Sequence, residues 1–138
     1  MKAPSEGTAT DLVYRTVWLT LGFIMLAAVL TVCLVPLKAP PVAPVFNDKV
    51  LHVLTFVVLT VWFGALFTRE HTKIVALGLL LFGVMIEALQ STTAYRSAEL
   101  LDLVADAGGI LIGWVLLRAG LQHWARWFEA NLLPEKHS

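Results

Sequence analysis

The chain has 138 residues, of which 58% are hydrophobic and only 14% are charged, and its mean hydropathy is +0.77. Soluble proteins carry about 25% charged residues, so the composition predicts an integral membrane protein with one domain, residues 1–138. Ten basic residues balance ten acidic ones and no basic run occurs, which excludes nucleic acid as an expected partner and leaves membrane lipids as the expected surroundings.

Four apolar stretches are predicted to span a bilayer, since about 20 apolar residues cross a hydrocarbon core of about 30 Å. The first two, residues 16–37 and 50–68, are long enough as they stand. The third begins at residue 74 and must extend through Glu87 and Gln90 to span, and the fourth must include Asp102 and Asp106. The expected fold is therefore all-α, with four transmembrane helices and acidic residues inside the last two.

The connections indicate which side of the membrane each end faces. Prolines between residues 36 and 44 predict a stiff, extended first connection. Seven of the ten basic residues fall in the N-terminal arm, the second loop and the tail, against three in the first and third loops. Basic residues in short loops favour the cytoplasm, so both termini are predicted to be cytoplasmic (N-in, C-in).

A tail, residues 119–138, follows the predicted transmembrane core, residues 16–118. Its apolar residues recur at helical spacing and form one stripe: Leu121, Trp124, Phe128 and Leu132. Such a stripe predicts an amphipathic helix at the cytoplasmic membrane interface, with Trp124 and Trp127 as anchors in the lipid.

Polar residues of three predicted helices reach a similar depth. At a rise of about 1.5 Å per residue from the inner ends, Asp106 lies about 17 Å up, Glu87 about 20 Å, and His52, Gln90 and Asp102 about 23 to 24 Å. An acid facing lipid near the midplane costs at least about 2.5 kcal/mol. We therefore expect these side chains to face the interior of the bundle and to form a polar funnel that opens to the outside.

Spacing along each helix supports this convergence. The polar residues form pairs that share one helix face: Asp48 with His52, Glu87 with Gln90, and Asp102 with Asp106. In the fourth span, Ala105, Gly109 and Gly113 repeat every four residues, and a small-residue face of this kind lets a neighbouring helix approach closely.

These residues, in this order, resemble the VanZ-like family of small bacterial membrane proteins. The matching pieces are DKVLH from Asp48 to His52, then Phe56, Glu87-x-x-Gln90, Arg96, Asp102, Gly109 and Gly113, over about residues 16–118. The resemblance implies a multi-pass protein of the bacterial cytoplasmic (inner) membrane and a link with reduced susceptibility to glycopeptide antibiotics, teicoplanin especially. It implies a site made of Asp48, Lys49, His52, Glu87, Gln90, Arg96 and Asp102. Asp106 departs from the family pattern, where we expect an asparagine.

The predicted funnel is acidic, because its carboxylates outnumber Lys49 and Arg96. These carboxylates belong to Asp48, Glu87, Glu99, Asp102 and Asp106. Such a site suits a cationic group, a shared proton or a divalent metal. The preferred interpretation is a noncatalytic protein that binds an extracytoplasmic envelope ligand, either a glycopeptide or a lipid-linked wall component.

Two alternatives remain open at this stage. The first is a small membrane enzyme acting on a lipid-linked or cell-envelope substrate, with His52 and a carboxylate as acid and base or with a metal-bound water. The second is a lattice of charges that only holds the helices in register.

No metal or other cofactor is predicted, because no metal-binding signature occurs in the sequence. If a divalent metal does bind, the candidate ligands are His52, Glu87, Asp102 and Asp106. Four helices enclose little volume, so a homo-oligomer is the arrangement that would complete a larger cavity. Cys33 is the only cysteine and lies in an apolar run, which predicts a small buried side chain and no disulfide.

Overall fold

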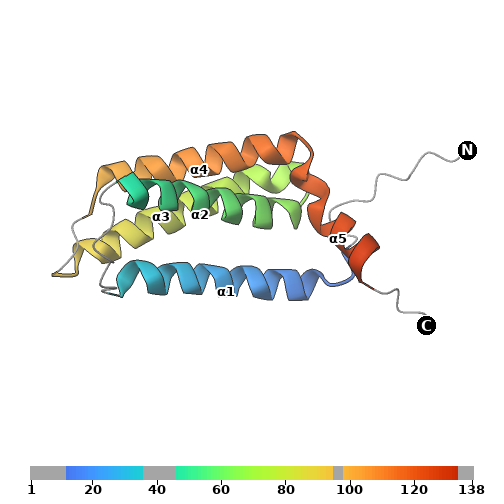
Figure 1. Ribbon diagram of the computed structural model, residues 1–138, viewed down its shortest axis with the longest axis horizontal. Coiled ribbons are helices and arrows are strands. Elements are labelled where there is room, and N and C mark those ends of the chain that lie inside the picture. The colour runs from blue at the N-terminus through green and yellow to red at the C-terminus, as the bar shows by residue number, and fades with distance from the viewer. Residues whose placement is uncertain (1–11, 36–45, 95–97, 134–138) are drawn as a thin grey trace, which may run out of the picture.

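The protein is a bundle of four long helices capped at one end by a short fifth helix (Figure 1). The computed structural model describes residues 12–35, 46–94 and 98–133, with the side chains of 46 and 47 left out. The long helices are α1 (Arg15–Leu34), α2 (Phe46–Ala65), α3 (Thr72–Ser91) and α4 (Leu100–Arg118). Two short 3-10 turns, η1 (Arg69–His71) and η2 (Leu121–His123), precede α3 and α5 (Trp124–Leu132).

All four long helices are long and apolar enough to cross a membrane, which confirms the predicted fold class. Two of them extend through their acidic residues as expected, since α3 continues past Glu87 to Ser91 and α4 begins at Leu100, before Asp102. Their outward faces carry large exposed side chains such as Leu77 and Leu111, which a bilayer would cover. The predicted proline-rich connection lies outside the described residues.

Helices α2 and α4 pack most closely, and two glycines of α4 explain why. A Cβ added to Gly109 would lie 2.9 Å from the Cβ of Phe56 and would overlap the carbonyl oxygen of Val53. A Cβ added to Gly113 would lie 2.6 Å from the Cβ of Thr60. The small-residue face predicted for this helix is therefore confirmed, and it brings the middle of α4 directly against α2.

Helix α1 packs against α2 and α3. The indole of Trp62 donates a hydrogen bond to the carbonyl oxygen of Trp18 at 3.1 Å, and a Cβ at Gly22 would lie 2.8 Å from the ring of Phe63. These contacts bury Trp18 at the end of the bundle where α5 also lies.

The tail folds onto the bundle and differs in part from the predicted membrane anchor. The ring of Trp18 lies 5.3 Å from that of Trp124 and 5.5 Å from that of Phe128, both in edge-to-face geometry. Two of the four residues of the apolar stripe, Trp124 and Phe128, therefore pack against protein. An apolar helix face can be buried against protein as well as in lipid. Trp127 is exposed, as expected for an anchor.

A carboxylate fixes the tail in this position. Glu129 accepts hydrogen bonds from the backbone N–H groups of Val13 and Tyr14 at 2.8 and 3.0 Å, and from the indole of Trp18 at 2.7 Å. Earlier in the tail, Gln122 is buried and donates to the carbonyl oxygens of Gly64 and Phe67. The start of α1, the end of α2 and α5 are thereby joined at one end of the bundle.

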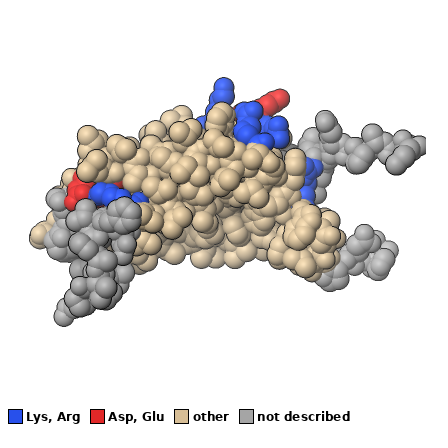
Figure 2. All heavy atoms as spheres, turned by 45° about the horizontal axis from the view of Figure 1, so that its top comes forward, with Lys and Arg blue, Asp and Glu red and all other residues tan. Residues whose placement is uncertain are grey.

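The two ends of the bundle differ in charge, with an uncharged belt between them (Figure 2). The end that carries α5, here called the basic end, holds Arg15, Arg69, Lys73, Arg118 and Arg126. The opposite end, here called the acidic end, holds Asp48, Glu87, Glu99, Asp102 and Asp106. The N-in, C-in orientation rests on this distribution of charge and stays a prediction.

Candidate functional site

The acidic end is built from the first turns of two helices. Asp48 lies in the first turn of α2 and Asp102 in the first turn of α4. Free backbone N–H groups and the helix dipole favour acidic side chains at both positions. One turn further on, α2 presents His52 and α4 presents Asp106, and the close packing of the two helices brings these residues together.

His52 lies between two carboxylates of α4. Its Nδ1 is 2.7 Å from Oδ1 of Asp106, and its Nε2 is 3.9 Å from Oδ2 of Asp102. All three side chains are buried, and that of Asp106 is 0% exposed. An ionised carboxylate can only accept a hydrogen bond. Asp106 in this form holds the Nδ1 proton and leaves Nε2 facing Asp102.

Lys49 closes the outer side of this group. Its ammonium lies 2.5 Å from Oε2 of Glu99 and also forms an ion pair with Asp102. The carboxylate of Glu99 is 50% exposed whereas that of Asp102 is 5% exposed. A positive charge therefore already lies between the surface and the buried carboxylates.

Two buried carboxylate oxygens have no hydrogen-bond partner among the described residues, Oε1 of Glu87 and Oδ2 of Asp106. The other oxygen of Glu87 accepts the backbone N–H of Glu99 at 3.0 Å. Oδ2 of Asp106 lies against Gly83 of α3, where an added Cβ would be only 2.8 Å away. Sequence reasoning missed Gly83, and no sequence signal separates it from Gly78 of the same helix, where an added Cβ would meet nothing within 4 Å.

The structure brings together most of the residues predicted for the site, here called the acidic cluster: Asp48, Lys49, His52, Asp102 and Asp106, bordered by Glu87 and Glu99. Gln90 lies elsewhere. Its side-chain amide donates to the carbonyl oxygen of Cys33 in α1 at 3.0 Å. The spacing of Glu87 and Gln90 puts both side chains on one face of α3. Two positions on the same helix face can still contact different neighbouring helices. Arg96 lies outside the described residues.

Buried members of the acidic cluster pair with one another or with Lys49. His52, Asp102 and Asp106 are buried, and Lys49 spans the outer side. The reason is physical: unpaired charges in a membrane are costly, so acids and bases at the same depth pair with one another. The outward-opening funnel stays a prediction, because residues 36–45 and 95–97 lie outside the described part of the chain.

Three side chains of the cluster could serve as ligands for a cation. Asp48, His52 and Asp102 each offer one donor atom, and these atoms all lie within 4.8 Å of one another. Oxygen and imidazole donors of this kind suit zinc or manganese. The set shares His52 and Asp102 with the candidate ligands from the sequence, and it contains Asp48 instead of Glu87 and Asp106. A metal would compete with the Lys49 ammonium for Asp102.

Comparison with known families matches residues 11–122 to VanZ/LLP1. The chain belongs to the VanZ/LLP1 family. The match encloses all four spanning helices of the protein and the whole acidic cluster, and it confirms the resemblance recognised in the motifs. No curated protein and no solved structure matches the chain.

Proposed function

We propose that this VanZ/LLP1-family protein binds a positively charged group of a cell-envelope ligand at its acidic end, and that this binding lowers susceptibility to glycopeptides such as teicoplanin. The observation that carries the proposal is the position of Lys49, whose ammonium is held between Glu99 and the buried Asp102. The same carboxylates would hold an ammonium group of a ligand.

The charge balance supports a cationic ligand. Among the described residues the acidic end holds the carboxylates of Asp48, Glu87, Glu99, Asp102 and Asp106. Lys49 is the one lysine or arginine that pairs with them in this part of the chain. A bare phosphate or carboxylate would be repelled there, whereas an amine would be attracted. Ionisable groups inside membrane-spanning helices are costly to keep, and they usually mark a functional site.

Exchange of one ammonium for another gives a mechanism for binding. Lys49 has a long, flexible side chain that is 20% exposed, so its head group can turn towards water while its stem stays on the bundle. A ligand amine would then take its place beside Asp102 and Glu99. The pair of His52 and Asp106 lies deeper and would hold α2 and α4 in position while the outer contacts change.

The predicted outward position of the acidic end agrees with an envelope ligand. If the basic end faces the cytoplasm, as the distribution of basic residues predicts, the acidic end faces outward. Glycopeptides and lipid-linked wall components are present on that side. The predicted location is the bacterial cytoplasmic (inner) membrane, and a homo-oligomer that widens the site is compatible with the proposal.

A second candidate function is catalysis on a lipid-linked or envelope substrate. It is favoured by one observation, the imidazole of His52 oriented by Asp106 at 2.7 Å, because a histidine held by a carboxylate is a common general acid or base. Purified protein incubated with envelope lipids would release product under this function and would leave the lipids unchanged under simple binding.

The test of the proposed function is expression in a glycopeptide-sensitive bacterium without an outer membrane. We expect the wild-type protein to raise teicoplanin tolerance and Asp102→Asn to abolish the increase at normal membrane abundance. Glu70→Gln makes the same chemical change at the basic end and should keep full tolerance. Loss of abundance together with tolerance would favour the charge lattice, and full tolerance in Asp102→Asn would reject the acidic cluster as the site.

A further inference from the structure

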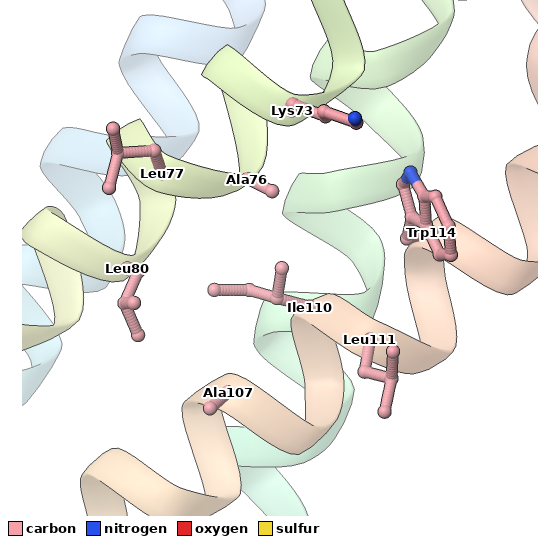
Figure 3. Close-up of a pocket in the computed structure, with 8 residues that line it drawn as sticks. All are labelled: Lys73, Ala76, Leu77, Leu80, Ala107, Ile110, Leu111 and Trp114. Atoms are coloured by element: carbon pink, nitrogen blue, oxygen red, sulfur yellow. The ribbon is translucent and has the colours of Figure 1, made fainter.

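A groove of about 380 Å³ runs between α3 and α4 near the basic end, away from the acidic cluster (Figure 3). Two alanines, Ala76 on α3 and Ala107 on α4, contribute side chains too short to fill the space between the helices. The apolar walls come from Leu77, Leu80, Ile110 and Leu111. Leu77 and Leu111 are well exposed. The groove therefore lies on the outer surface of the bundle and opens towards the lipid that would surround it.

The polar end of this groove has hydrogen-bond donors and no acceptor. In Figure 3 the ammonium of Lys73 and the indole nitrogen of Trp114 point towards one another across that end. Within residues 12–35, 46–94 and 98–133, neither group has a hydrogen-bond acceptor or an acidic partner. The guanidinium of Arg118 lies 4.9 Å from the centre of the Trp114 ring and adds a second positive charge. This end of the groove would therefore attract a negatively charged group that accepts hydrogen bonds.

We infer that this groove binds one anionic phospholipid, with its phosphate between Lys73 and Trp114 and an acyl chain along the groove. Two features support this occupant. The positive charges of Lys73 and Arg118 match a phosphate, and the apolar walls of the groove match an acyl chain. Lys73 and Leu80 are separated by about 10 Å along the helix at about 1.5 Å per residue, so the groove leads from an interfacial head group into the hydrocarbon. Basic pockets between transmembrane helices commonly hold anionic head groups.

The competing explanation is that Lys73 and Trp114 are ordinary interfacial residues. Lysine and tryptophan at the membrane boundary contact many lipids without selecting one. That explanation predicts no preference for this groove over the rest of the basic end. The inferred lipid site is also independent of ligand binding at the acidic end.

The experiment is native mass spectrometry of the full chain released from detergent in the presence of phosphatidylglycerol or phosphatidylcholine with identical acyl chains. We expect one phosphatidylglycerol per chain, retained at least fivefold more than phosphatidylcholine. Lys73→Gln should reduce that preference at least threefold, and Ala107→Leu should reduce retention by filling the groove. Arg69→Gln removes a basic side chain from the same end outside the groove, so it should keep the preference.

Three results would overturn the inference. The first is equal loss of preference in Lys73→Gln and Arg69→Gln, which would indicate general attraction to the basic end. The second is equal retention of the two lipids by the wild-type protein. The third is displacement of the lipid by an equal concentration of glycerol phosphate, which would show that the head group alone is recognised. Thermal melting without added lipid should be unchanged in Lys73→Gln, since this side chain is exposed.

Discussion

The imidazole of His52 lies 2.7 Å from the carboxylate of Asp106, although 54 residues separate them in the chain. The contact depends on backbone packing one turn deeper, where Gly109 lets α4 approach the carbonyl oxygen of Val53. A pair of buried polar groups and a glycine contact therefore act together. The glycine sets the distance between the helices, and the pair satisfies the polar atoms that this distance buries.

Replacing Asp106 separates the role of its hydrogen bond from the role of its charge. Asp106→Asn keeps an amide that can donate to or accept from Nδ1 of His52, so the melting temperature should fall only slightly. Asp106→Leu leaves the buried imidazole nitrogen unpaired, which costs about 1 to 3 kcal/mol, and should lower the melting temperature clearly. The measurement is thermal unfolding of both purified variants in the same detergent. Equal melting temperatures would contradict the importance of this hydrogen bond.

Neighbouring glycines of α4 provide a matched test of the close helix packing. Gly109→Ala forces a Cβ against Val53 and Phe56 and should destabilise the protein by about 1 to 3 kcal/mol, as overpacking usually does. Gly108→Ala meets open space and should leave stability unchanged or slightly higher. Denaturant unfolding of the two variants decides the point. Similar losses in both would show that helix contact is not the reason for Gly109.

The tail should detach when its carboxylate is removed. Glu129→Ala eliminates the acceptor of three hydrogen bonds, from Val13, Tyr14 and Trp18. Hydrogen bonds to a charged group contribute about 1.5 to 3 kcal/mol each. We expect faster hydrogen exchange across α5 and at the start of α1, with α2 to α4 unchanged. Asn131→Ala is the control, because among the described residues its side chain bonds within α5, to the carbonyl oxygen of Trp127. Unchanged exchange in Glu129→Ala would show that aromatic packing alone holds the tail.

Membrane orientation can be measured with single cysteines in a Cys33→Ala background. Ala98 precedes α4 at the acidic end and is exposed, and Glu70 is exposed at the basic end. An impermeant thiol reagent should label Ala98→Cys in intact cells and Glu70→Cys only after lysis. The opposite pattern would place the acidic cluster in the cytoplasm and would contradict the proposed envelope ligand.

The long helices could be predicted from the sequence because membrane crossing imposes a length and a composition. The requirement to reach spanning length already placed Glu87 and Asp102 inside helices, and α3 and α4 include them. The small-residue repeat likewise predicted the packing of Gly109 and Gly113, since only backbone approach explains glycines at that spacing.

Partners across the bundle could not be predicted in the same way. Spacing places a side chain on a helix face but does not say which helix meets that face. Gln90 therefore bonds to α1 and not to the acidic cluster, and Trp124 packs against Trp18 of α1. The pairing of Lys73 with Trp114 at one end of the groove could not be predicted either, because the two residues belong to different helices and become neighbours only in the folded bundle.

Direct binding of fluorescently labelled teicoplanin to the purified protein tests the central claim most directly. Fluorescence anisotropy should show saturable binding to the wild-type protein and to Glu70→Gln. Asp102→Asn should bind at least about tenfold more weakly, since tenfold corresponds to about 1.4 kcal/mol and loss of one partner of a buried charge pair costs more. Equal affinity of Asp102→Asn and the wild-type protein would contradict the account, and no saturable binding by either would exclude the glycopeptide itself as the ligand.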